Sequence, residues 1–176
     1  VAATNDSDLA VQLHRGQLVS GALLPPIDSY RLLQDVKTLA LRLERQQQNA
    51  RELIDFLSAR PEVEQIFYPG SSSEEQAEVQ SRQARGIGSV FSLLLKDGGN
   101  AQAFARALPI FVNAVSLGGI ESLVSLPAHT THGAYAQEHR DEFGVDDRLV
   151  RLAIGIEDIQ DLIAALEIGL KAAFAG

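Results

Sequence analysis

The hydrophobic positions between residues 30 and 61 recur at the spacing of one helix face. Most of them are three, four or seven residues apart, which is typical of an amphipathic helix. Pro61 ends the pattern, and about 30 residues at 1.5 Å each would form a rod of roughly 45 Å. Such a rod is longer than most globular helices, so we expect it to bridge two domains or to line an interface. The apolar positions are Leu32, Val36, Leu39, Leu43, Ala50, Leu53, Ile54 and Leu57.

A shorter helix is predicted near the beginning of the chain. Residues 7–15 carry a helical pattern, with Ser7 as the N-cap. Pro25 and Pro26 then interrupt the chain, and Asp28 is placed to cap the long helix. Nothing before residue 60 predicts a strand or a core of its own. We therefore expect this part of the chain to pack against a structure outside this sequence.

Beyond Pro61 the pattern changes to short apolar runs that alternate with helical stretches. Several of these runs end in turn residues such as Gly, Pro and Asp, as strands commonly do. Alternating strands and helices predict an α/β fold, or α+β sandwich, in which helices cover one face of a sheet. We expect two domains, at residues 1–59 and 60–176. The predicted strands are 63–68, 88–95, 110–115, 121–126 and 149–154, the predicted helices are 100–108, 134–143 and 159–170, and 71–85 is a loop or a surface helix.

Composition and charge narrow the class of protein. The chain has 176 residues, of which 45% are hydrophobic and 22% charged, as in a globular domain with or without an appendage. Its net charge of −8 disfavours nucleic acid or an acidic membrane surface as a partner, because like charges repel. It contains no cysteine, which excludes disulfides and thiolate chemistry. No apolar run approaches the ~20 residues that span a bilayer, and residues 1–8 lack a signal-peptide pattern, so we expect a cytoplasmic protein.

One arginine interrupts an apolar strand. Arg151 lies within the predicted strand 149–154, and a buried guanidinium requires an anion, for which a carboxylate is a good geometric match. The alternatives are an edge strand with Arg151 facing solvent, or a structural ion pair. Arg148, just outside the strand, is expected to face solvent. Gly118 and Gly119 would allow backbone N–H groups to approach a ligand, or would form a tight turn.

Three histidines raise the question of a metal site. His129 and His132 are three residues apart, the spacing of one helix face. Pro127 and the threonines favour a loop instead, and no carboxylate is placed as a third ligand. We therefore expect these two and His139 to be ordinary loop histidines, with no metal. No serine lies in a Gly-x-Ser-x-Gly motif, so a hydrolase triad is not predicted.

Several short motifs occur together along almost the whole chain. They are Asp28-Ser29-Tyr30, residues 36–43, Asn49-Ala50, residues 63–70, residues 86–92, Ser116-Leu117-Gly118-Gly119, Pro127-Ala128, Thr131-His132 and residues 151–158. Each motif is weak alone, but the ordered set resembles the C-terminal part of the trans-sulfuration family of pyridoxal-phosphate enzymes, and looks closest to cystathionine β-lyase. The resemblance implies the small domain of an aspartate aminotransferase-like enzyme of fold type I, preceded by the helix that links it to the large domain.

The resemblance also implies roles for individual residues. Arg151 would bind the α-carboxylate of the substrate, with help from Ser116 and the Leu117 backbone, and Thr131 would lie near the substrate. Val115 stands where γ-lyases and γ-synthases often carry Glu, which favours the β-lyase branch. We therefore expect the intact enzyme to cleave a C–S bond by α,β-elimination. The alternatives are a cystathionine γ-lyase or γ-synthase, and a non-catalytic binding or assembly module that retains the fold.

The resemblance places the cofactor lysine outside this chain. That lysine is expected before Val1, and Lys37, Lys96 and Lys171 do not lie in its motif. We therefore expect pyridoxal 5'-phosphate in the intact enzyme, but no catalytic residue, no cofactor-binding residue and no bound cofactor in this chain alone. The expected partners are an amino-acid thioether substrate, the missing large domain and further copies of the protein, as a dimer of dimers. Gln34-Asp35 stands where the family usually has Arg-Gly, which changes a local contact.

Overall fold

The chain forms two compact units, Val1–Ala40 and Leu41–Gly176. The computed structural model describes residues 2–69 and 73–175. The sheet and the hydrophobic core belong to the second unit. The boundary expected between residues 59 and 60 concerns the domains of the whole protein and stays a prediction.

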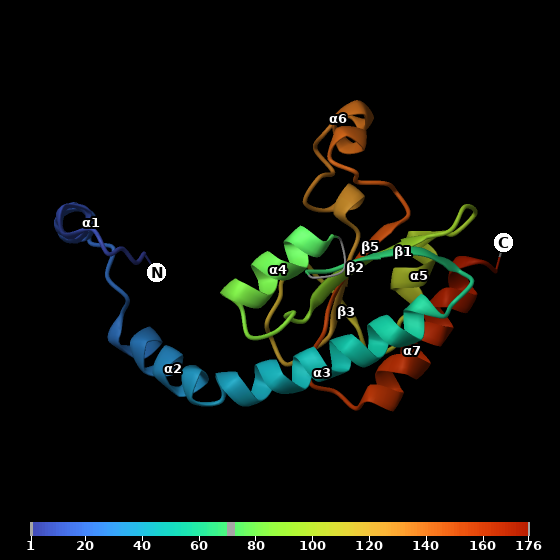
Figure 1. Ribbon diagram of the computed structural model, residues 1–176, viewed down its shortest axis with the longest axis horizontal. Helices are drawn as coiled ribbons and strands as arrows, with labels where there is room; N and C mark the ends of the chain where they lie inside the picture. Colours follow the sequence, from blue (N-terminus) through green and yellow to red (C-terminus); the bar gives the residue numbers. More distant parts are fainter. Residues whose placement is uncertain (1, 70–72, 176) are drawn as a thin grey trace. The chain divides into compact units, whose positions relative to one another are not determined.

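Helix α1, Ser7–Ser20 (Figure 1), begins where it was predicted but has a different N-cap and ends later. Its N-cap is Asp6, whose Oδ1 accepts hydrogen bonds from two backbone N–H groups at 2.9 Å. The expected cap, Ser7, is therefore the first helical residue, because the carboxylate before it already satisfies those donors. The helix continues past Arg15 to Gly21, whose left-handed φ of 66° ends it.

Helix α2, Pro26–Lys37, begins at the prolines and not at Asp28. Pro26 occupies the first turn, where its missing N–H is harmless, and Asp28 lies within that turn. None of the described residues of α1 or α2 is buried. Many of their apolar side chains are exposed, including Leu18, Val19, Leu23, Ile27, Tyr30 and Leu33.

The single long helix expected up to Pro61 is wrong, because the chain leaves the helical conformation at Thr38. This residue has φ −107° and ψ 1°, and α3, Leu39–Ser58, begins immediately after it. The Thr38 hydroxyl donates a hydrogen bond to the Asp35 carbonyl oxygen at 3.4 Å. Such local side-chain bonds compete with the helical pattern, and the β-branched side chain weakens helix propensity further.

Within the described residues, five short strands form one mixed sheet (Figure 1). The strand order is β1-β2-β5-β4-β3, and neighbours are antiparallel except for the parallel pair β3 and β4. The predicted strands 110–115 and 121–126 are shorter in the structure, because β3 lies at the sheet edge and pairs with β4 over only two residues. The strands are β1 Val63–Phe67, β2 Val90–Leu95, β3 Val112–Asn113, β4 Leu123–Ser125 and β5 Leu149–Ala153.

Helices α3, α5 (Ala101–Ala107) and α7 (Ile159–Ala173) supply the buried residues that pack on one face of the sheet (Figure 1). The side chain of Asn100 caps α5 and that of Asp158 caps α7. The predicted α/β sandwich with helices on one face of the sheet is therefore confirmed. The core includes Leu53, Leu57, Phe91, Leu93, Phe104, Val124, Leu152, Leu162, Leu166 and Leu170.

Two further helices contribute no buried residue. Helix α4, Glu74–Gln83, lies in the segment predicted as a loop or surface helix, of which residues 71–72 lie outside the described chain. Helix α6, Gln137–Glu142, is shorter than the predicted 134–143, because the backbone is still extended at Ala136, its N-cap. Among the described residues, no helix is both long and apolar enough to cross a bilayer.

Candidate functional site

Arg151 lies in the middle of the sheet, on the face that points away from the helices. The strands on either side place Ser92 and Ser125 directly opposite it. Val150 and Leu152, its neighbours in sequence, are fully buried in the core. Because side chains alternate between the two faces of a strand, Arg151 and the two serines lie on the opposite face. The edge-strand alternative is therefore wrong.

The guanidinium of Arg151 has no partner among the residues that the structure describes. No hydrogen bond or ion pair joins it to any of them, although the residue is partly buried. Its five N–H donors are fixed in a planar fork that suits a carboxylate. A guanidinium in such a position can bind an anion such as a carboxylate. The structural ion pair considered for Arg151 is thus not found in the described part of the chain, and its donors remain available for a ligand.

The other candidate residues follow two parallel neighbouring strands, β3 and β4. Strands β3 and β4 are parallel, and Ser125, which pairs with Arg151, is the last residue of β4. The segment after β3 therefore leaves the sheet at the end where Ser125 and Arg151 lie. Ala114 N donates to Val124 O at 3.1 Å, which extends this parallel pairing by one residue. Val115, Ser116 and Leu117 follow directly and are exposed.

The segment after β4 begins at this same end. It forms the 3-10 helix Pro127–His129 and then a series of turns that contains Thr131. Thr131 is exposed, and its Oγ1 lies 2.8 Å from Nδ1 of His132. The His132 ring packs against Tyr135 and Phe143, with centroids 5.8 and 6.2 Å apart. Both segments that carry candidate residues therefore leave the sheet at the carboxyl ends of β3 and β4, and β4 is the neighbour of β5.

Arg148 does not face solvent as expected. Its guanidinium binds the carboxylates of Asp146 at 2.8 Å and Glu64 at 3.0 Å, and also that of Asp97. The side-chain hydrogen bond from Arg148 holds the pKa of Asp146 below its ordinary value, and the same bond raises the pKa of Arg148. This cluster joins β1, the turn after β2 and the start of β5. It is an ion network of the sheet, and its arginine is already occupied.

The remaining ionisable candidates do not gather into a site. Among the described residues, no three His, Asp or Glu side chains are close enough to hold a metal. His129 Nε2 lies 3.2 Å from the Gln102 amide nitrogen. The three lysines are all exposed, on α2, after β2 and on α7.

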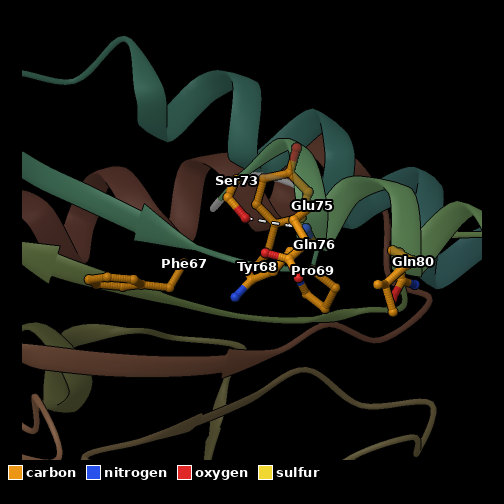
Figure 2. Close-up of a pocket in the computed structure, with 8 residues that line it drawn as sticks. Phe67, Tyr68, Pro69, Ser73, Glu75, Gln76 and Gln80 are labelled. Atoms are coloured by element: carbon orange, nitrogen blue, oxygen red, sulfur yellow. Dashed lines mark hydrogen bonds between the residues drawn. The ribbon is translucent and has the colours of Figure 1, made fainter.

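A hollow of about 660 Å³ lies between the end of β1 and α4 (Figure 2). Sequence analysis did not predict it, because its walls come from a strand end and a polar helix. Phe67 of this wall pairs with Ser92, which in turn pairs with Arg151, so one edge of the hollow adjoins the open sheet face. None of the predicted site residues lines it. The lining residues are Phe67, Tyr68, Pro69, Ser73, Glu75, Gln76, Val79 and Gln80.

Sequence analysis also missed a group of polar side chains that bind the loop carrying Ser116. Gln46 and Asn49 on α3 are fully buried, and their amide groups donate to backbone carbonyl oxygens of this loop and of the turn after β5. Glu157, in the turn after β5, binds Ser122. The sequence does contain a signal that could have revealed Gln46 and Asn49. These two amide side chains are three residues apart within the apolar face of α3.

With this geometry established, the comparisons with known proteins identify the class. Residues 1–171 match the model of the Cys/Met metabolism PLP-dependent enzyme family, and the chain belongs to this family. A cystathionine gamma-lyase of Bacillus subtilis (strain 168) is 40% identical over 160 residues, 91% of this chain and 42% of that protein. A cystathionine beta-lyase of Lactococcus lactis subsp. cremoris is 37% identical over 168 residues, 96% of this chain and 44% of that protein.

A solved structure shows the same fold. Cystathionine gamma-lyase from Lactobacillus plantarum, complexed with L-serine, matches with a TM-score of 0.90 and 35% identity over 97% of this chain and 45% of that one. The predicted family and the fold type I domain are thus confirmed. The chain spans less than half the length of these relatives, at 42 to 45%.

Proposed function

We propose that the whole protein is a pyridoxal-phosphate-dependent carbon–sulfur lyase acting on an amino-acid thioether such as cystathionine. In this proposal the present chain supplies the small domain and the residues that bind the α-carboxylate of the substrate. The observation that carries the proposal is Arg151, a central-strand arginine without a partner among the described residues, opposite the last residue of β4. The family match and the names of the relatives support the class of reaction.

The proposed reaction explains why the substrate carboxylate must be bound in a fixed position. The cofactor, when bound, supplies an electron sink for the bond broken at the substrate Cα. Arg151 would fix the carboxylate through two parallel N–H···O bonds, which sets the orientation of that bond. Ser116 and the Leu117 backbone would contact the same carboxylate, and Thr131 would border the substrate from the other loop.

We further propose that the reaction is β-elimination. Val115 is half exposed at the carboxyl end of β3 and presents an apolar surface beside Ser116. An apolar wall cannot hold a distal ammonium group, but it leaves a thiol free to depart from the β-carbon. The second candidate is a γ-lyase, because the relative from Bacillus subtilis carries that name. Measuring pyruvate and 2-oxobutyrate from one cystathionine reaction distinguishes the two candidate reactions. An excess of pyruvate supports β-elimination, and an excess of 2-oxobutyrate contradicts it.

The exposed apolar side chains of α1 and α2 support a partner surface in the whole protein. We propose that a large domain and further copies of the protein cover them, in a cytoplasmic homo-oligomer built as a dimer of dimers. Size measurement of the intact protein by light scattering tests the assembly.

The role of Arg151 is tested in the intact protein with Arg151→Ala. Losing a charge-assisted bidentate contact should cost about 2–4 kcal/mol, roughly 30- to 1000-fold in kcat/KM. Arg151→Lys should restore little, because an ammonium group lacks the planar fork. The matched control is Arg82→Ala, which removes an exposed arginine from α4. A kcat/KM for Arg151→Ala close to that of the control would contradict the proposed role.

A further inference from the structure

The loop after β3 is bonded to the turn after β5 by a side-chain network. The Glu157 carboxylate accepts hydrogen bonds from Ser122 N at 2.6 Å and from Ser122 Oγ at 2.9 Å. Ser122 Oγ in turn accepts from Gly155 N at 2.9 Å, and Ile156 N donates to Ile120 O at 2.9 Å. Ser122 is completely buried. These hydrogen bonds therefore join the two segments directly to each other.

Two side chains of helix α3 form hydrogen bonds with both segments. Gln46 Nε2 donates to Gly119 O at 2.5 Å, and Asn49 Nδ2 donates to Gly155 O at 3.2 Å and to Glu157 O at 3.0 Å. Both side chains are fully buried, yet Gln46 Oε1 and Asn49 Oδ1 have no partner among the described atoms. A buried acceptor without a donor is destabilising. Each amide thus donates to backbone carbonyl oxygens of the two segments, while its own oxygen has no partner among the described atoms.

The contact between the two segments is also sterically tight. A Cβ placed on Gly155 would lie 2.2 Å from Ile120 O and 2.5 Å from the Glu157 carboxylate. Only a glycine allows this approach, so the loop backbone rests directly on the turn.

These contacts determine where Ser116 and Leu117 lie. Residues 115–118 make no hydrogen bond to any other described residue, so only the ends of this stretch are fixed. One end is Ala114, which bonds to β4, and the other is Gly119, which Gln46 holds. The turn held by Asn49 follows β5, the strand that carries Arg151.

We propose that Gln46, Asn49, Ser122 and Glu157 are positioning residues that set the distance between the Ser116–Leu117 loop and Arg151, and thereby the affinity for the substrate carboxylate. This inference rests on the proposed function. None of the four residues contacts the substrate. They act by holding the two backbone segments on which the carboxylate contacts are built.

The test uses the intact, cofactor-loaded protein and two ligands that differ only in a carboxylate. Glycine and methylamine are titrated while the absorbance of the bound cofactor is followed. Gln46→Met keeps the length of the side chain and removes the donor together with the unpartnered acceptor, so we expect an unchanged or higher melting temperature. Glycine should nevertheless bind about tenfold more weakly, because a small misplacement of a contact group is enough to lose such a factor. Methylamine binding should not change.

Two variants complete the series. Ser122→Ala should also weaken the binding of glycine but not that of methylamine, and it should raise the KM of the lyase reaction more than it lowers kcat. Glu157→Gln retains an acceptor for Ser122 N and should therefore keep most of the wild-type affinity for glycine. The matched control is Ser58→Ala on α3, which loses one hydrogen bond, to Ile54 O, and reaches neither segment.

The outcomes separate this inference from the function on which it rests. If Arg151→Ala weakens the binding of glycine but not of methylamine, and Gln46→Met and Ser122→Ala do not, the positioning role is wrong. The proposed role of Arg151 in binding the carboxylate is then still supported. An equal loss for glycine and methylamine in the two variants would also overturn it, as a purely structural effect. If Arg151→Ala itself leaves glycine binding unchanged, the proposed function fails first.

Discussion

Replacing Gly155 by alanine provides a stringent test of how the site is held together. The added methyl group would meet Ile120 O at 2.2 Å and the backbone carbon of Glu121 at 2.7 Å. Ordinary contacts between such atoms are longer by about 1 Å, so the loop or the turn must move by that amount. Backbone atoms cannot rotate away as a side-chain tip can, and the movement would break the bond from Gly155 N to Ser122 Oγ.

The magnitude follows from these two effects. Overpacking a buried site costs about 1–3 kcal/mol, and one lost hydrogen bond costs about 1 kcal/mol. We therefore expect Gly155→Ala to lower the free energy of unfolding by about 2–4 kcal/mol. With a urea slope of about 2 kcal/mol/M, the midpoint should fall by roughly 1–2 M.

Urea unfolding of the 176-residue chain, followed by circular dichroism, measures this shift. The matched control is Gly119→Ala in the same loop. Its Cβ would approach only the carboxylate tip of the exposed Glu121, at 3.0 Å, which can swing aside. We expect the control to change stability by less than about 0.5 kcal/mol. Equal midpoints for Gly155→Ala and the control would refute the close packing of loop and turn.

Two further predictions concern ionisable groups. The lowered pKa of Asp146 means that its ion pair with Arg148 stabilises the fold above the ordinary carboxyl pKa near 3.8, and that this stabilisation is lost as the pH falls through the lowered value. The difference in urea midpoint between wild type and Asp146→Asn should thus shrink from pH 7 to pH 2, and a constant difference would contradict it. Second, Lys37, Lys96 and Lys171 do not lie in the motif of the family's cofactor lysine, so pyridoxal phosphate should form no stoichiometric borohydride-reducible adduct with any one of them in this chain, as peptide mass mapping can check.

Local sequence patterns predicted the elements of the second unit well. The apolar spacing of α3 and α7 and the apolar runs of β2 and β5 are properties of neighbouring residues, and so are the caps Asn100 and Asp158. The long helix failed at Thr38, where a side-chain hydrogen bond to the backbone overrides the continuing apolar period. The resemblance to the family, carried by ordered motifs, also came from sequence alone.

What the tertiary structure decided is which of these residues meet. Arg148 and Arg151 lie three residues apart, yet Arg148 binds carboxylates 51 and 84 residues away and Arg151 has no partner in the described chain. Likewise, Asn49 reaches the turn after β5 across 106 residues. A sequence pattern fixes the face on which a side chain lies, because that depends on the local backbone period. Partners at such separations depend on strand order and register, which are set only when the sheet closes around its core.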